Sequence, residues 1–188
     1  ETGSSLAKFA TRSLVSQDNF MQSALSTGHI NISSDPDGIY RHYPLIIRIN
    51  SGYFPSIVLT SFLNSTNVRF QDIVINWGQS IIIPAKKNNE LSSDIRIPID
   101  SSGHVIIPFF KFSASQENTF ERYDASDFLR EYSDKLKREE LANKFIEGRF
   151  VFISDVSQGI PDKGKTPIHD VEQPLALVHA SVLNGLLN

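Results

Sequence analysis

A run of four apolar residues near the end of the chain constrains the fold more than any other sequence feature. Phe150, Val151, Phe152 and Ile153 follow one another with no polar residue between them. A run of this length is typical of a strand buried on both faces of a sheet. A helical pattern precedes it, and a loop and a further helical pattern follow, which is the order found in α/β domains. We therefore predict an α/β or α+β fold, with a central mixed sheet flanked by helices and a helix at the C-terminus.

Two turn signals predict β-hairpins that extend this sheet. The sequence Asp-Pro-Asp-Gly at residues 35–38 favours a tight turn, in which Gly38 can adopt a positive φ. Residues 29–49 are therefore predicted to form a hairpin. Pro44 should lie at an edge or a bulge of it, because proline donates no hydrogen bond to a neighbouring strand. A second turn, Asp-Ser-Ser-Gly, predicts another hairpin over residues 95–107.

The spacing of apolar residues predicts the remaining elements. Intervals of three and four residues indicate helices at residues 5–25, 57–63, 124–147 and 174–187. The third of these has two apolar faces out of register, so we expect two short helices or a kink, with Asp124 or Ser126 as the N-cap. Short apolar runs predict further strands at residues 68–70, 73–75 and 81–83, and a polar loop follows at residues 85–94.

Charge and cysteine content exclude several classes of protein. Lys and Arg number 18 against 21 Asp and Glu, a net charge of −3, whereas nucleic-acid-binding domains are normally basic. Without cysteine the chain has no disulfide, no thiol nucleophile and no Cys-ligated metal. No run approaches the roughly 18 apolar residues that span a bilayer. We expect one domain at residues 4–188, with Glu1, Thr2 and Gly3 left by a secretion vector.

Residues 159–166 match the phosphate-binding pattern GxxxxGK[ST]. In a true P-loop the pattern starts at the end of a strand, and a helix begins at its Lys-Thr pair so that backbone amides face the phosphates. Here residues 154–158 separate the pattern from the predicted strand, and the helical pattern starts only near Pro174. We therefore expect no ATP binding and no cofactor.

The loop over residues 154–173 is the predicted place where a ligand or signal is received. Ligands of open α/β sheets bind beyond the carboxyl ends of strands, and a loop of this length is long for a connection without function. The candidate side chains, the last of them on the following helix, are Asp155, Asp162, Lys163, Thr166, His169 and His179. The alternative is an ordered structural loop in which Asp162 caps local amides, and a hydrogen-bonded structural role for His179.

Two weaker sequence signals concern a metal site and N-glycosylation. His169 and Asp170 could meet Asp155 or Asp162 in a metal site, but the histidines lack metal-ligand spacing and we expect no bound metal. The triplets that begin at Asn31 and Asn64 match the N-glycosylation acceptor pattern. Both asparagines would be modified only if the chain were secreted from a eukaryotic host.

Several segments, in order and spacing, resemble the second family of CHASE domains, the cyclase/histidine-kinase-associated sensory extracellular domains. The first and middle blocks of the resemblance are Gly28, Asp37, Gly38, Arg41, Pro44, Leu45, Gly52, Pro55 and Ser56, then Ile97, Pro98, Asp100 and Gly103, then Ala125, Asp127 and Leu129. The last and strongest block is Gly148, Arg149, Val151, Ile153, Gly159, Asp162, Thr166, Pro167, Pro174, His179, Ala180, Leu183, Leu186 and Leu187. The resemblance covers residues 20–188 and the C-terminal two thirds of the family pattern. The family's N-terminal third is either trimmed or replaced by the helix at residues 5–25.

The resemblance implies an extracytoplasmic sensor domain of a membrane-bound signalling protein, such as a nucleotide cyclase or a histidine kinase. It implies that membrane contact comes only through flanking helices absent from this chain, and that the domain itself is not catalytic. We expect an unidentified small ligand or protein signal, a homodimer in the full-length receptor, and no nucleic-acid partner. The alternative is an extracellular adhesion or protein-interaction module that uses the charged region at residues 124–147. A small hydrolase is a third reading, weakened by the absence of a GxSxG nucleophile elbow.

Overall fold

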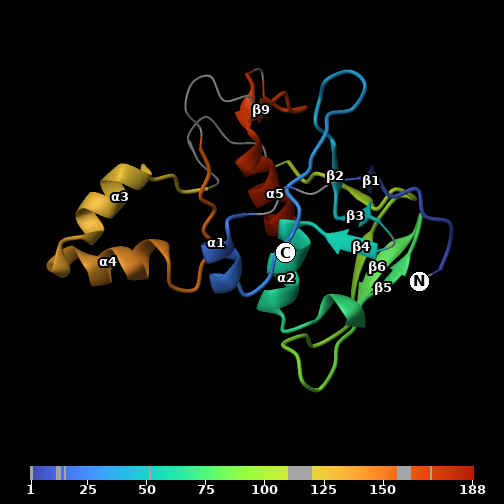
Figure 1. Cartoon of the computed structure of the whole chain (residues 1–188), viewed down its shortest axis with the longest axis horizontal. Coiled ribbons are helices and arrows are strands. Elements are labelled where there is room, and N and C mark those ends of the chain that lie inside the picture. The colour runs from blue at the N-terminus through green and yellow to red at the C-terminus, as the bar shows by residue number, and fades with distance from the viewer. Residues whose placement is uncertain are drawn as a thin grey trace.

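The computed structural model describes residues 2–11, 14, 16–50, 52–109, 120–155, 162–169 and 171–188. Helices and short strands are mixed in an α+β arrangement, as expected (Figure 1). The helices are α1 (Asp18–Ser23), α2 (Ile57–Ser65), α3 (Ala125–Tyr132), α4 (Lys135–Phe145) and α5 (Leu175–Leu187), with a 3-10 turn η1 (Phe70–Asp72). The strands are β1 (Phe9–Ala10), β2 (His42–Pro44), β3 (Ile46–Ile49), β4 (Gly52–Pro55), β5 (Val74–Asn76), β6 (Ser80–Ile83), β7 (Ile95–Pro98), β8 (His104–Ile106), β9 (Lys163–Gly164) and β10 (Gln173–Pro174).

The core lies between α2, α5 and the strands that surround them. The two helices pack against each other, and Figure 1 shows α5 beside α2. Ser56 caps α2, since its Oγ accepts a hydrogen bond from the Leu59 N–H at 3.1 Å. We call these helices and strands together the body of the domain. Its fully buried side chains include Tyr43, Leu45, Ile46, Ile47, Val58, Leu59, Ile81, Ile83, Val178, Val182 and Leu183. Helix α5 is thus a core element as well as the last helix of the chain.

The described strands form several small sheets instead of one central sheet. Strands β3 and β4 form an antiparallel hairpin around Asn50, whose φ is +52°. Strands β5, β6 and β7 form an antiparallel sheet in the order β5-β6-β7. Strand β2 pairs with β8, and β9 pairs with β10. Pro44 therefore lies in an edge strand, as its missing N–H requires.

Both predicted turns are confirmed, whereas both predicted hairpins are wrong. Gly38 and Gly103 have φ values of +81° and +80°, and the N–H of each donates to the carbonyl three residues earlier. The arms, however, separate after each turn. Ile39 bridges to Lys165 while β2 joins β8, and β7 joins β6. A turn is set by local backbone preferences, but the partner of each strand is set by which edge buries more apolar surface.

The N-terminal helix predicted at residues 5–25 is wrong except for α1. Residues 9 and 10 form β1, which adds in parallel to the free edge of β3. The Arg48 guanidinium lies 6.0 Å from the centre of the Phe9 ring across this pair. Even Thr2 is hydrogen-bonded to the backbone of β5. The chain start gains sheet hydrogen bonds here, which outweighs a weak helical pattern.

The strand predicted at residues 150–153 is also wrong. These residues form no strand, and Phe150, Val151, Phe152 and Ile153 are 44, 55, 38 and 90% exposed. They run beside α2 and α5, whose side chains share a cavity with them. The backbone groups of a helix are bonded within the helix, so neither neighbour offers an edge to which a strand could pair.

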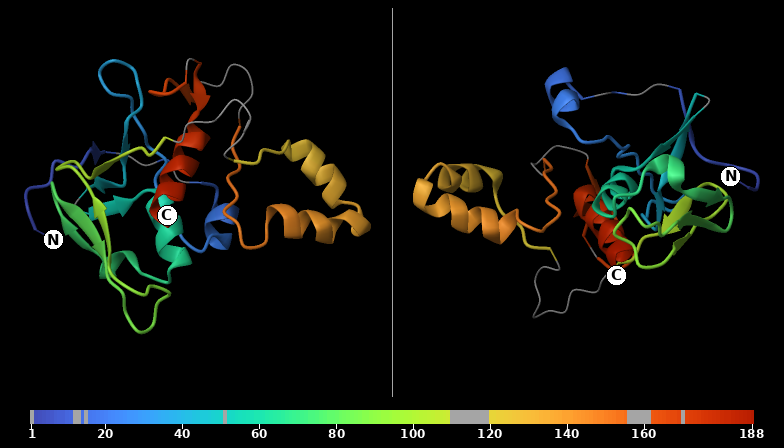
Figure 2. Two further views of the ribbon diagram at one scale, coloured as in Figure 1. Left: turned by 180° about the vertical axis from the view of Figure 1, so that it is seen from behind. Right: turned by 90° about the horizontal axis from the view of Figure 1, so that it is seen from below.

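Helices α3 and α4 form a helical arm, residues 120–149, that extends from the body in each view (Figure 2). The sequence predicts two short helices or a kink here, and two helices are present. Asp124 caps α3: its Oδ1 accepts from the N–H groups of Ser126 and Asp127 at 2.8 and 3.4 Å. The arm has its own aromatic cluster, with ring centres 4.8 to 6.3 Å apart, made of Tyr123, Phe128, Tyr132 and Phe145.

Most of the other predicted elements are confirmed, and one predicted strand is wrong. Helix α2, strands β5 and β6 and the polar loop at residues 85–94 are confirmed within a few residues. The strand predicted at residues 68–70 is wrong, because residues 68 and 69 are irregular and Phe70 begins η1. Each confirmed strand adjoins another in the sequence, so that pairing costs little loop-closure entropy.

Candidate ligand site

The predicted loop at residues 154–173 is divided between solvent and the body. Asp155, Asp162 and Lys163 are exposed, while Thr166 is buried. The Thr166 hydroxyl is hydrogen-bonded to Nδ1 of His169 at 2.6 Å, which ties these two candidates to each other. Asp170 and residues 156–161 lie outside the described part of the chain, so the proposed metal grouping of His169 with Asp170 is not tested. This hydrogen bond is the kind of internal contact that an ordered structural loop would have.

The second half of the P-loop pattern has a structural role too. Gly164 lies in β9 opposite Gln173, and a side chain at this glycine would overlap the Tyr40 ring. Lys165 bridges to Ile39 from the turn. The next described helix is α5, which begins at Leu175, so the helix that a P-loop requires does not begin at the Lys165-Thr166 pair. Residues 159–161 of the pattern lie outside the described residues.

A cavity of about 340 Å³ lies where residues 150–154 run beside the two core helices. Ile57 and Ser61 of α2, four residues apart, face it from one side, and Ala176 and His179 of α5, three residues apart, face it from another. The other lining residues are Ile30, Phe150, Val151, Phe152, Ile153, Ser154 and Asp162. The cavity thus brings two of the predicted candidates, Asp162 and His179, to one place.

His179 is held in the cavity wall by a buried hydrogen bond. Its Nδ1 lies 2.7 Å from the Tyr43 hydroxyl, and the two rings meet edge to face with centres 5.3 Å apart. Burial lowers the pKa of His179, and Asp162 only partly opposes this effect. Burial likewise raises the pKa of Tyr43, which a hydrogen bond to Ser56 partly offsets. A neutral imidazole and a neutral phenol therefore face each other at pH 7.

A second buried histidine, His29, lies near enough to His179 for their charges to interact, and it was not a candidate from the sequence. It is 8% exposed, and neither ring nitrogen has a hydrogen-bond partner within the described ranges. Burial, with a smaller effect of nearby His179, lowers the pKa of His29 to about 4. Its backbone is fixed against the start of α2, where His29 N–H donates to Pro55 and Ile57 N–H donates to His29. No periodicity marks this residue, so only the tertiary structure reveals it.

The residue before it, Gly28, permits this close approach. A Cβ at Gly28 would overlap the backbone of Ile57. The glycine therefore lets the segment before the turn lie directly on the start of α2. As a result Ile30, two residues later, reaches the cavity.

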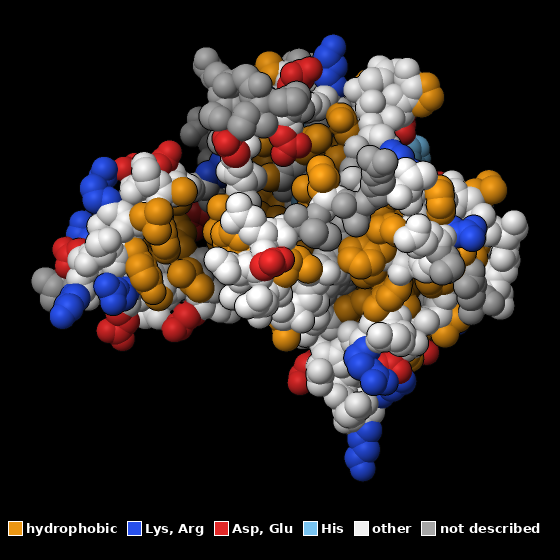
Figure 3. All heavy atoms as spheres, viewed as in Figure 1, with side chains coloured by type: hydrophobic (Ala, Val, Ile, Leu, Met, Phe, Trp, Pro, Cys, Tyr) orange, Lys and Arg blue, Asp and Glu red, His pale blue; other side chains and the backbone are white. Residues whose placement is uncertain are grey.

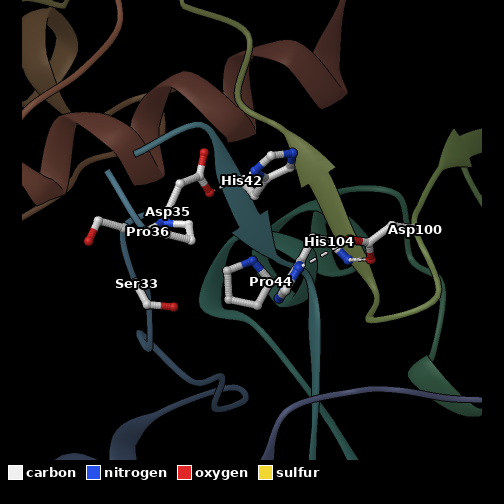
Figure 4. A pocket seen from close by; sticks show the side chains of 8 residues that line it. Ser33, Asp35, Pro36, His42, Pro44, Asp100 and His104 are labelled. Atoms are coloured by element: carbon white, nitrogen blue, oxygen red, sulfur yellow. Dashed lines mark hydrogen bonds and ion pairs between the residues drawn. The ribbon is translucent and has the colours of Figure 1, made fainter. Parts of the chain in front are cut away.

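A smaller pocket of about 210 Å³ lies on another face, between the turns that precede β2 and β8 (Figure 4). It is lined by two histidine–aspartate pairs: His42 Nδ1 lies 2.8 Å from Asp35 Oδ1, and His104 Nδ1 lies 3.3 Å from Asp100 Oδ2. The hydrogen bond from His42 lowers the pKa of Asp35, and Arg41 adds to the effect. Strand alternation in β2 and β8 places the two histidines on one face, a signal present in the sequence but not used there.

Across the residues that the structure describes, no group of three or more His, Asp or Glu side chains could hold a metal ion. The larger cavity contains two predicted site residues, whereas Asp155, Lys163, Thr166 and His169 lie outside its lining. We therefore take the larger cavity as the candidate ligand site.

Comparison with known families identifies the chain. Its sequence matches the CHASE2 domain over residues 4–188. The chain belongs to the CHASE2 domain family. CHASE2 domains are extracellular sensory domains of signalling proteins and are generally non-catalytic. The match begins at residue 4, earlier than residue 20, where the resemblance in the sequence began. No curated protein and no solved structure matches the chain. No helix in the described part of this CHASE2 domain combines the length and apolar character needed to cross a membrane.

Proposed function

We propose that this CHASE2 domain is the extracytoplasmic, signal-receiving part of a membrane-bound signalling protein such as a nucleotide cyclase or a histidine kinase. The single observation that carries the proposal is the position of the cavity. It is bounded on one side by residues 150–154, which follow the helical arm, and on the other by the first two turns of α5. A molecule in the cavity would therefore touch both segments at once.

The rest of α5 supports this reading. Leu175, Val178 and Val182 are buried in the core, so a displacement of its first turns would be passed along a rigid, packed helix. A ligand shifts such an equilibrium only if it binds one arrangement more tightly than the other. Contact with both residues 150–154 and α5 makes the affinity depend on their separation.

The proposal can be tested in the full-length protein with a variant that fills the cavity. Ala176→Phe places a ring where Ala176 now lines the cavity, whereas Leu187→Phe changes an exposed residue at the end of the same helix. We expect Ala176→Phe to fix the signalling output at one level, and Leu187→Phe to respond like the parent. A folded Ala176→Phe variant that responds to its signal as the parent does would overturn the proposal.

The adhesion or protein-interaction alternative has one observation in its favour. Figure 3 shows hydrophobic side chains gathered on the arm, where Leu129 and Ile146 are exposed. Leu129→Asp would abolish partner capture if the arm were the functional surface, and would leave the signalling output unchanged if the cavity is. For the hydrolase reading, the one observation at this cavity is that the hydrogen bond of His179 is to the Tyr43 hydroxyl and not to a serine.

A further inference from the structure

The described lining of the larger cavity is mostly apolar and includes one acidic side chain and no basic one. Seven of its residues are apolar or alanine, two are serines, and the remaining two are Asp162 and His179. Among the described residues, no Lys or Arg lines it. Because burial lowers the pKa of His179, its imidazole is neutral at pH 7. Asp162 is then the one charged side chain in the described lining.

Asp162 is held at the start of α5, where it lines the cavity. Its carbonyl accepts the N–H of Leu175 at 3.0 Å, which fixes the residue at the start of α5. Its side chain is exposed, yet close enough to His179 to raise that residue's pKa against the effect of burial. A free helix N-terminus attracts anions, but here a carboxylate already stands at that end. An anionic ligand would meet an unfavourable charge.

The opposite wall suits a cation with an apolar group. Phe150 and Phe152 are partly exposed and line the cavity. Aromatic side chains offer large apolar surfaces against which an aromatic or alkyl group can pack. Val151, Ile153 and Ile57 offer further apolar surface. A volume of about 340 Å³ lies at the lower end of the range for small-molecule sites.

We infer that the cavity binds a small organic ammonium ion that carries an aromatic or branched alkyl group. The ammonium N–H groups donate to the Asp162 carboxylate, and the apolar group packs against Phe150, Phe152 and Ile57. This inference rests on the proposed function, since it names the chemical class of the signal that the cavity would receive.

Calorimetry with three probes of one shape tests the inference directly. The probes are 2-phenylethylammonium, 2-phenylethanol and phenylacetate, which differ mainly in charge. We expect the ammonium ion to bind the parent about tenfold more tightly than the alcohol, and phenylacetate to bind most weakly. Asp162→Asn should remove the advantage of the ammonium ion and leave the alcohol unchanged. Asp155→Asn, which alters a carboxylate outside the lining, should behave like the parent.

Several outcomes would overturn the inference. They are equal binding of the three probes, tighter binding of phenylacetate, no measurable binding of the ammonium ion, or an Asp162→Asn variant that keeps the preference. The cavity-filling variant separates this failure from failure of the proposed function. If Ala176→Phe fixes the signalling output while the probes show no preference for the cation, the sensor proposal stands and only the ligand class is wrong.

Discussion

Two apolar runs of similar length differ in this domain: one forms a buried strand, and the other forms no strand and is partly exposed. Residues 81–83 lie in β6, between β5 and β7, with Ile81 and Ile83 fully buried. Residues 150–153 are at least as apolar, yet they form no strand and each is more than a third exposed. The first run has strands on both sides that are near in sequence, whereas the second has helices beside it. An apolar run becomes a buried strand only where another backbone edge is within reach.

The same contrast separates the body from the helical arm. The body buries its apolar side chains between α2, α5 and several sheets, while the arm has its own aromatic cluster and leaves Leu129 and Ile146 exposed. We therefore expect the two regions to differ in stability. Trp77, the single tryptophan, is 5% exposed in the body, so its fluorescence reports on the body alone.

The largest effect should come from the same substitution made in each apolar run. Ile81→Ala removes a fully buried side chain and should lower the free energy of unfolding by about 2–5 kcal/mol. Ile153→Ala changes a side chain that is 90% exposed and should cost less than about 0.5 kcal/mol. Denaturant unfolding followed by Trp77 fluorescence measures both. Equal losses would mean that residues 150–153 are buried in solution and that the comparison fails.

Acid should act on the body through its buried histidines. The pKa of His29 is lowered from 6.5 to about 4. Between these two pH values the unfolded chain therefore binds a proton at His29, whereas the folded chain does not. Stability is therefore fully present above pH 6.5 and falls as the pH is lowered toward 4, by at most about 3 kcal/mol from this residue. His179, whose pKa is lowered too, adds in the same direction. Trp77-monitored unfolding as a function of pH tests this dependence.

His29→Leu provides the control for the acid effect. The buried imidazole has no hydrogen-bond partner at either nitrogen in the described structure, so replacing it by an apolar side chain should be neutral or stabilising at pH 7. The variant should also lose much of the acid dependence. An unchanged pH profile would show that another group is responsible.

Substitution of one glycine with a positive φ in each region compares how the body and the arm respond to backbone strain. Gly38 (φ +81°) lies in the body and Gly148 (φ +66°) ends the arm, and a Cβ at either would meet no other atom within 4 Å. Valine at either position therefore adds backbone strain without a clash. We expect Gly38→Val to destabilise the body by more than about 1 kcal/mol. Gly148→Val should lower helical circular dichroism while leaving the Trp77 transition in place.

Gly52→Val is the control for these variants. Gly52 lies in β4 without a positive φ, and a Cβ there makes only ordinary contacts. It should be tolerated. If Gly148→Val shifts the Trp77 transition as far as Gly38→Val does, the arm and the body unfold as one unit.

The smallest effect should be confined to the first turn of α3. Asp124→Ala removes the side chain that accepts from Ser126 and Asp127, so α3 loses its N-cap. We expect a small loss of far-ultraviolet helical signal and no change in the Trp77 transition. Glu139→Ala, which changes an exposed carboxylate inside α4, serves as the comparison. A large loss of body stability on Asp124→Ala would show that the arm supports the body.

Features that depend on neighbouring residues were predictable from the sequence. The turns at residues 35–38 and 100–103, the two helices of the arm, the short helix after Ser56 and the C-terminal helix all follow from glycine conformations, capping groups and apolar spacing. The family could be recognised as well, because its signature is an order of such local features. Asp162 and His179 were candidates for another reason, because the loop was expected beyond the carboxyl end of a strand at residues 150–153, and that strand does not form.

The partners of each segment were decided only by the tertiary structure. Which strand pairs with β2 or β7, and whether residues 150–153 find an edge at all, depends on surfaces brought together from distant parts of the chain. The same holds for the cavity, where α2, α5 and residues 150–154 meet, and for His29, which no pattern distinguishes. Hydrogen-bond preferences act over a few residues, whereas burial depends on every segment that competes for the same surface.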